Sequence, residues 1–127
     1  MFEKLVPFLT DDVILIGHSL GACFLTRYLA ENLFSRNIRA ILLVAGVYSG
    51  NVAGMTKEFS APESLELLDK QSDHVFLYHS KDDNVVPFSE LAKYQTALPN
   101  ALTRVFSNQG HFGQETFPEL VADIKSL

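Results

Sequence analysis

A serine lies within the segment ILIGHSLGA, which covers Ile14–Ala22. Gly17, Ser19 and Gly21 have the spacing G-x-S-x-G, which is typical of a nucleophilic serine held at a sharp turn between a strand and a helix. The glycines are expected because a side chain two residues before or after the serine would collide with neighbouring backbone. The apolar residues on both sides predict the strand and the helix. The alternative interpretation is a glycine-rich turn that only connects two elements.

A serine nucleophile needs a base, and the base needs a carboxylate that orients it. The segment KDDNVVP, after one predicted strand, contains Asp82 and Asp83, and the segment NQGHFG, after the next, contains His111. Because the carboxyl ends of parallel strands meet at one edge of a sheet, we expect these groups to lie near Ser19. Either aspartate can supply the carboxylate, and the alternative for both is a side chain that caps a turn.

The remaining histidines and the cysteine suggest weaker roles. His18 is the variable residue of the serine turn and is expected to line the site rather than react. His74 and His79 flank a predicted strand and are expected to be structural or on the surface. Cys23, four residues after the serine, is expected to pack in the core. No His-x-x-x-His or Cys-x-x-Cys spacing is present, so no metal site is predicted.

The elements that must position these residues alternate between strands and helices. Four short apolar runs predict strands, at Val13–Ile16, Ala40–Ala45, His74–Tyr78 and Thr103–Phe106. The second run is continuously apolar, which indicates a strand covered on both faces, as in a parallel sheet. Helices are predicted at Leu20–Asn32, Leu65–Lys70, Glu90–Leu98 and from Thr116–Glu119 to the end of the chain. The pattern predicts a single α/β domain over residues 1–127, with a mostly parallel sheet and helices on both faces.

The starts of three predicted helices carry capping signals. Ser60 and Glu63, and likewise Thr116 and Glu119, have the spacing of a capping box with proline in the first turn. Ser89 is placed to cap the helix that follows it. Leu20–Asn32 is apolar on most sides and predicts a largely buried helix.

Composition excludes several classes of partner. The 127 residues carry a net charge of −5 and no run of Lys or Arg, so nucleic acid and anionic membranes are not expected. One cysteine cannot form an internal disulfide and fits a reducing compartment. The N-terminus lacks the pattern of a signal peptide, and the longest apolar run, Ala40–Val47, is too short to span a bilayer. We therefore expect a cytoplasmic protein.

Three segments resemble the motifs of a known family. Leu15–Ala22, Ser80–Phe88 and Gly110–Phe112 are similar to those of the α/β-hydrolase superfamily, in the family of small serine hydrolases of the retinoblastoma-binding protein nine and YdeN type. The resemblance covers nearly the whole chain. It implies a three-layer α/β-hydrolase-type fold and a serine hydrolase that acts on small ester or amide substrates through an acyl-enzyme, without a cofactor.

The resemblance also implies roles for particular residues. Ser19 is the nucleophile, His111 is the base, and Asp83 rather than Asp82 is the acid, because the family has the spacing Asp-x-x-Val-Pro. The backbone N–H of Leu20, at the start of the helix, donates one hydrogen bond to the oxyanion. The segment between Tyr48 and Ser60 is expected to be a loop in which Met55 or Phe59 borders the acyl pocket.

The chain departs from the family pattern in two places. His79 stands where the family has glycine. Only Met1–Thr10, enough for one helix, precedes the first predicted strand, so we expect an N-terminally shortened fold without the family's leading strand and its Gly-rich loop. That loop supplies the second oxyanion donor, and its loss leaves Val13–Ile16 as an apolar sheet edge. We therefore expect a homo-oligomer that pairs this edge or a loss of full activity. The alternatives to an active enzyme are a catalytically impaired binding module and a fragment complemented by a second chain.

Overall fold

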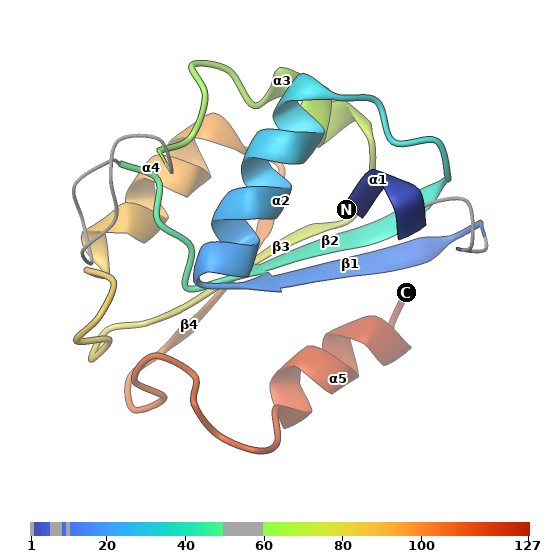
Figure 1. The fold of residues 1–127 in the computed structure, drawn as a ribbon. Helices are drawn as coiled ribbons and strands as arrows, with labels where there is room; N and C mark the ends of the chain where they lie inside the picture. The colour runs from blue at the N-terminus through green and yellow to red at the C-terminus, as the bar shows by residue number, and fades with distance from the viewer. Residues whose placement is uncertain (1, 6–8, 10, 50–59) are drawn as a thin grey trace.

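Strands and helices alternate along the chain in the computed structural model, which describes residues 2–5, 9, 11–49 and 60–127 (Figure 1). The strands are β1 (Val13–His18), β2 (Ile38–Val44), β3 (Val75–Ser80) and β4 (Leu102–Phe106). The helices are α1 (Phe2–Leu5), α2 (Leu20–Glu31), α3 (Glu66–Lys70), α4 (Ser89–Ala97) and α5 (Pro118–Lys125). The strands form one parallel sheet in the order β1-β2-β3-β4.

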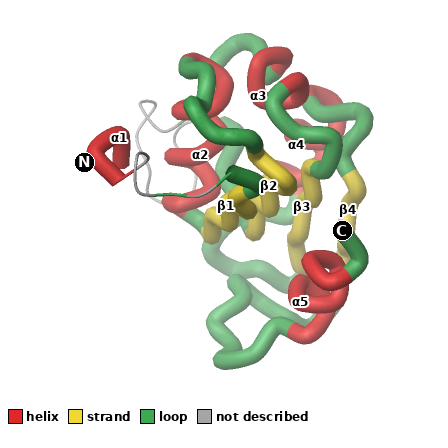
Figure 2. The backbone as a smooth tube through the Cα atoms, turned by 90° about the vertical axis from the view of Figure 1, so that its right-hand side faces the viewer, coloured by secondary structure: helices red, strands yellow, loops and turns green. Residues whose placement is uncertain are grey.

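Helices cover both faces of this sheet, which gives three layers. Figures 1 and 2 show α2, α3 and α4 on one side of the sheet and α5 on the other. The side chains of β2 alternate between two cores: Ile41 and Leu43 pack toward α2 and α4, and Leu42 and Val44 pack toward α5. The predictions of an α/β fold with a parallel sheet and of a second strand buried on both faces are therefore confirmed.

The predicted capping box of α3 is wrong. The helix begins at Glu66 rather than after Ser60, its N-cap is Leu65, and the N–H of Glu66 donates to the Ser64 hydroxyl. The backbone near Ser60 is held elsewhere: its carbonyl accepts a hydrogen bond from the Arg27 guanidinium, and the next residue, Ala61, donates its N–H to the Tyr48 carbonyl. These contacts tie the segment to α2 and to the loop after β2.

An aromatic residue occupies the N-cap of each of the other two helices for which a cap was predicted, α4 and α5. The N-cap of α4 is Phe88 and that of α5 is Phe117, neither with a side-chain cap, so the capping roles predicted for Ser89 and Thr116 are also wrong. The ring of Phe117 lies 5.3 Å from that of Phe112 in the α5-side core. The packing of this partly buried ring, rather than a side-chain cap hydrogen bond, accompanies the start of α5.

Helix α2 is less buried than predicted. Leu20 and Phe24 lie one turn apart and are 50% and 46% exposed. They line an apolar groove of about 510 Å³ along the outer side of the helix. Strand β1 lies at one edge of the sheet formed by the described residues, and Ile16 on it is 49% exposed. Among the helices described, none is long and apolar enough to cross a membrane.

Candidate active site

Ser19 occupies the turn between β1 and α2 in a strained backbone conformation. Its φ of 57° and ψ of −112° lie in a region that residues with a Cβ rarely adopt. Its N–H donates to the Val44 carbonyl of β2, and its own carbonyl accepts from the N–H of Cys23 in the first turn of α2. The strand and the helix thus both hold the turn, and the hydroxyl projects at the carboxyl edge of the sheet.

The two glycines of the G-x-S-x-G motif have different reasons to be glycine. A Cβ on Gly17 would lie 2.6 Å from the Gly21 carbonyl oxygen and 2.7 Å from backbone atoms of Ala22, so only glycine fits. A Cβ on Gly21 would have no heavy atom of the described chain within 4 Å. The expected collision is therefore confirmed at Gly17. At Gly21 it is wrong for the described residues, because none of them packs against that side of α2.

Ser19, His111 and Asp83 form one hydrogen-bonded chain. His111 Nε2 lies 2.9 Å from Ser19 Oγ, and His111 Nδ1 lies 2.8 Å from Asp83 Oδ2. The carboxylate can only accept, so Nδ1 carries the proton and Nε2 is left to accept the Ser19 hydroxyl proton. The Asp83 side chain is fully buried, whereas the His111 ring is 21% exposed. These three side chains come from the turn after β1, the loop after β3 and the loop after β4, as the sequence predicted.

Backbone donors fix the second oxygen of Asp83. The N–H groups of Val85 and Val86 donate to Oδ1 at 2.8 and 2.9 Å. Burial raises the pKa of Asp83, but the hydrogen bonds from His111, Val86 and Val85 outweigh it and leave the pKa below its ordinary value. The carboxylate is therefore ionised at neutral pH, as an orienting acid must be.

Asp82 contacts the backbone of the histidine loop rather than the His111 ring. Its Oδ1 accepts from the Gly110 N–H at 2.9 Å and from the Ser80 hydroxyl, whose oxygen in turn accepts from the Gln109 N–H. The hydrogen bonds from Ser80 and Gly110 lower the pKa of Asp82. Sequence reasoning treated the two aspartates as competitors and missed this second role, because it depends on a loop 28 residues away.

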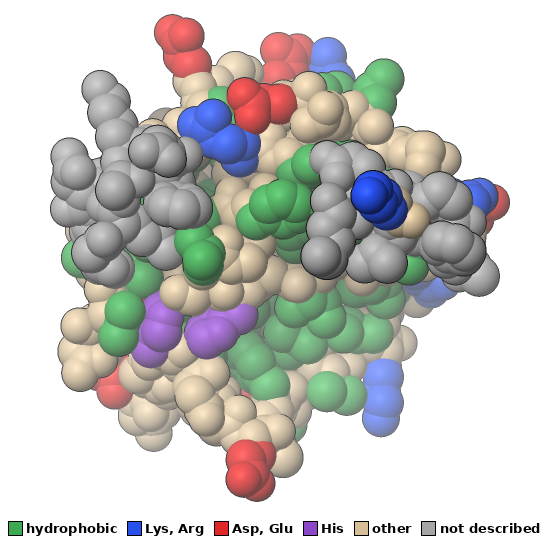
Figure 3. Space-filling model, in the orientation of Figure 1, with side chains coloured by type: hydrophobic (Ala, Val, Ile, Leu, Met, Phe, Trp, Pro, Cys, Tyr) green, Lys and Arg blue, Asp and Glu red, His purple; other side chains and the backbone are tan. Residues whose placement is uncertain are grey.

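His18 makes a further contact with the histidine loop. Its Nε2 lies 2.7 Å from the His111 carbonyl oxygen, to which it donates, and the two rings are 4.9 Å apart. Gly110 has a φ of +56°, a conformation that suits the glycine predicted in this loop. Figure 3 shows histidine side chains at the surface beside an apolar area of the same face.

The predictions for the other two histidines have different outcomes. His74 precedes β3 and is exposed, as expected. His79 does not flank the strand: β3 extends to Ser80, two residues further than predicted, and His79 lies inside it with 1% of its surface exposed. Cys23 is buried, as predicted, and its thiol donates to the Val47 carbonyl. Burial raises the pKa of this thiol, which disfavours the reactive thiolate.

Leu20 is the first residue of α2, so its N–H has no acceptor within the helix. It directly follows Ser19, at the end of the helix that carries the positive end of the dipole.

The predicted pocket residues Met55 and Phe59 lie outside the described residues. In the described ranges, no group of three or more His, Cys, Asp or Glu side chains could hold a metal ion.

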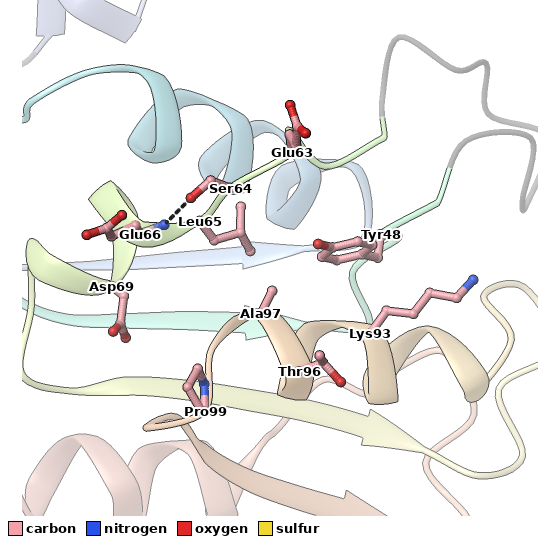
Figure 4. Close-up of a pocket in the computed structure, with 10 residues that line it drawn as sticks. All are labelled: Tyr48, Glu63, Ser64, Leu65, Glu66, Asp69, Lys93, Thr96, Ala97 and Pro99. Atoms are coloured by element: carbon pink, nitrogen blue, oxygen red, sulfur yellow. Dashed lines mark hydrogen bonds between the residues drawn. The ribbon is translucent and has the colours of Figure 1, made fainter.

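A cavity of about 640 Å³ lies apart from this site, between α3 and α4 (Figure 4). Its lining residues are Tyr48, Glu63, Ser64, Leu65, Glu66, Asp69, Lys93, Thr96, Ala97 and Pro99. None of these belongs to the Ser19–His111–Asp83 chain. The cavity offers no nucleophile–base pair among its lining residues, so the candidate active site is the carboxyl edge of the sheet.

Comparison with known proteins gives the family. A family model described as serine hydrolase matches residues 2–119. This chain belongs to the serine hydrolase family. Serine hydrolase RBBP9 of Rattus norvegicus is 30% identical to it over 121 residues, which cover 92% of this chain and 62% of the relative. The chain thus spans less than two thirds of the length of that serine hydrolase.

Solved structures place the chain among α/β hydrolases by fold. The ydeN gene product of B. subtilis superposes with a TM-score of 0.85 at 24% identity and covers 98% of this chain and 70% of its own. The α/β-hydrolase MGS-M1, from a deep-sea metagenome library, has a TM-score of 0.64 at 20% identity and covers 84% and 45% of the two chains. This serine hydrolase chain therefore has the α/β-hydrolase type of fold that its motifs predicted.

Proposed function

We propose that the chain is a serine hydrolase of small ester or amide substrates, in which Ser19 is the nucleophile, His111 the base and Asp83 the orienting acid. The observation that carries this proposal is the hydrogen-bonded chain from Ser19 Oγ through both ring nitrogens of His111 to Asp83 Oδ2, at 2.9 and 2.8 Å. Membership of the serine hydrolase family supports it. A serine in an ordinary turn would need neither the strained φ nor the aligned base.

The first half of the reaction forms an acyl-enzyme. Ser19 Oγ attacks the carbonyl carbon of the substrate while its proton passes to His111 Nε2. Asp83 stabilises the resulting imidazolium through the proton on Nδ1. His111 then gives the Nε2 proton to the leaving alcohol or amine as the bond to the carbonyl carbon breaks. In the second half, water attacks the acyl group by the same proton route and releases the acid and Ser19.

The backbone N–H of Leu20 is the proposed oxyanion donor. The tetrahedral intermediate carries negative charge on the former carbonyl oxygen. An N–H at the start of α2 would stabilise that charge by donating a hydrogen bond to this oxygen. Removal of one such donor typically costs about 100- to 1,000-fold in rate. This donor is a backbone group, so we expect substitutions of the half-exposed Leu20 side chain to affect substrate binding more than the rate of the chemical step.

The proposal is tested by hydrolysis of p-nitrophenyl acetate, with release of p-nitrophenol followed at early times. We expect a burst of product equal to the enzyme concentration, which reports the acyl-enzyme. Ser19→Ala is expected to abolish the burst and to lower the rate at least about 1,000-fold. Ser64→Ala, in a serine near α3, is the matched control and keeps the burst. A folded wild-type protein without hydrolysis would instead favour the binding-module alternative.

We propose a second copy of the chain as partner, with pairing along the edge of β1. Strand β1 is the terminal strand of the described sheet, and Ile16 on it is half exposed. An apolar strand edge of this kind favours pairing with another strand.

We also propose a cytoplasmic location, which the single cysteine of the sequence fits.

A further inference from the structure

His79 is buried directly beneath the loop that carries Asp83. It is a residue of β3, and 1% of its side chain is exposed. Its ring packs edge-on against Phe88, with the ring centroids 5.6 Å apart. Its Nε2 lies 3.1 Å from the Val86 carbonyl oxygen and 3.2 Å from Asp83 Oδ2. One ring nitrogen thus faces both the carboxylate and the far end of its loop.

The chemistry of these neighbours decides where the proton lies. A carbonyl oxygen and an ionised carboxylate accept hydrogen bonds and cannot donate them. The pKa of Asp83 is lowered, mainly because hydrogen bonds outweigh the effect of burial, so its carboxylate is ionised. Nε2 of His79 therefore carries a proton, which is donated to the Val86 carbonyl and places a positive N–H edge against Oδ2.

Through Val86 and by direct contact, His79 lies close to the partners of both oxygens of the Asp83 carboxylate. The Val86 carbonyl accepts a hydrogen bond from His79 Nε2–H, and the Val86 N–H donates one to Asp83 Oδ1 at 2.9 Å. Oδ2, which lies 3.2 Å from His79, is the oxygen that accepts the His111 proton. His79 therefore holds the residue whose N–H fixes Oδ1 and also lies beside Oδ2, the oxygen bonded to His111.

We propose that His79 is a positioning residue, which keeps the Asp83 carboxylate aligned with His111 through Val86. The inference rests on the proposed function of the Ser19–His111–Asp83 chain. A histidine that served only to fill the core would need a single acceptor for its N–H. The nearly equal distances to Val86 and Asp83 instead place the N–H where a rotation of the carboxylate would move Oδ2 away from the partial positive charge of that N–H.

The protonation of His79 is tested without any substitution. Nitrogen-15 NMR of the histidine-labelled protein distinguishes a ring protonated at Nε2 from one protonated at Nδ1 alone. We expect the His79 spectrum to show the proton on Nε2, with slow exchange because the ring is buried. A His79 ring protonated only at Nδ1 would overturn the proposal, whether or not the protein hydrolyses esters.

Matched substitutions test the positioning role. Gln at position 79 keeps an N–H donor at about the same distance from the backbone, and Met has similar length without one. We expect His79→Met to lower kcat for p-nitrophenyl acetate about 10-fold or more with little change in KM. The reason is that the lost hydrogen bond holds Val86, whose N–H binds the charged Asp83 carboxylate. His79→Gln is expected to recover most of that kcat. A Met variant within twofold of wild type, or a Gln variant as slow as Met, would contradict the proposal.

A spectroscopic readout separates this inference from the proposed function. The proton between His111 Nδ1 and Asp83 gives a downfield proton resonance when the two groups are held together. We expect His79→Met to broaden or shift this resonance and His79→Gln to preserve it. If wild type is inactive toward esters, the proposed function fails, and the resonance still decides the role of His79. An unchanged resonance in a folded Met variant would overturn that role.

Discussion

Two adjacent aspartates have separate tasks at the active site. Asp83 lies against the His111 ring, and Asp82 holds the Gly110 N–H in the same loop. Neighbouring side chains of a turn point in different directions, so Asp83 is the proposed orienting acid and Asp82 holds the loop of the proposed base.

We expect Asp83→Asn to lower kcat/KM toward p-nitrophenyl acetate about 10⁴-fold, because an amide can leave His111 in the wrong tautomer. Asp82→Asn, the matched control, removes charge from a loop anchor, and we expect it to lower kcat/KM about 10-fold or less. Steady-state kinetics of both variants check the prediction. A larger loss in Asp82→Asn than in Asp83→Asn would reverse the assignment.

Residue types and spacing predicted the candidate site residues that the fold brings together, but not the contacts that support them. The G-x-S-x-G pattern and the aspartate and histidine that follow later strands pointed to Ser19, Asp83 and His111. The family spacing Asp-x-x-Val-Pro favoured Asp83. The contact of His79 with the Asp83 loop could not be predicted, because it depends on β3 continuing two residues beyond its apolar run and turning that ring inward.

The elements position the serine through one close approach, between the end of β1 and the first turn of α2. We expect Gly17→Ala to lower the free energy of unfolding by at least about 2 kcal/mol, because its Cβ would lie 2.6–2.7 Å from backbone atoms. Gly21→Ala has room and is helical, so we expect it to raise stability by about 0.5–1 kcal/mol. Urea unfolding of both variants measures the difference, and equal effects would contradict this account of the turn.

Helix α5 is attached to the sheet by one buried carboxylate. Asp123 accepts a hydrogen bond from the Tyr78 hydroxyl of β3 and two from the Arg104 guanidinium of β4. The hydrogen bond from Arg104 contributes most to a lowered pKa of Asp123, with burial acting against it. Burial of Tyr78, together with its contact to Asp123, raises the pKa of the Tyr78 hydroxyl, so this hydroxyl remains a donor.

We expect Asp123→Asn to lower the free energy of unfolding by about 1–3 kcal/mol at pH 7. Because the folded pKa lies below the ordinary value of about 3.9, this contribution is fully present above pH values near 4 and is lost as the pH falls through the folded pKa. In urea unfolding of wild type and variant from pH 7 to pH 3, the difference between their free energies of unfolding should therefore narrow as the pH falls below about 4. Glu66→Gln, in an exposed pair with Lys70, is the control and should leave the free energy of unfolding nearly unchanged over this pH range. A difference that grows as the pH falls would contradict the assignment.

Apolar periodicity predicted every strand of the described residues and the order of the elements, whereas the predicted caps of α3, α4 and α5 were wrong. The capping patterns at Ser60, Ser89 and Thr116 were interpreted from local spacing alone. In the folded chain, the Ser60 carbonyl is bound by Arg27, and the N-cap of α5 is Phe117, whose partly buried ring packs against Phe112. Packing between distant segments overrides a local cap worth about 1 kcal/mol.

The described sheet has two edge strands, β1 and β4, and the proposed oligomer pairs along β1 but not along β4. Ile16 on β1 and Val105 on β4 are 49% and 48% exposed. We expect size-exclusion chromatography with light scattering to show a dimer or larger species for wild type and for Val105→Lys. Ile16→Lys is expected to give a monomer, because a lysine on an edge strand opposes pairing. A monomeric wild-type protein would rule out pairing along β1.

Covalent labelling with a fluorophosphonate probe tests the central claim most directly, because the probe reacts only with a serine that its surroundings have activated. The account predicts one probe per chain, located at Ser19 by mass spectrometry of the digested protein, with labelling lost in Ser19→Ala and strongly slowed in His111→Ala. Labelling that persists in Ser19→Ala, or its absence from folded wild-type protein, would contradict the assignment of Ser19 as the nucleophile of a serine hydrolase.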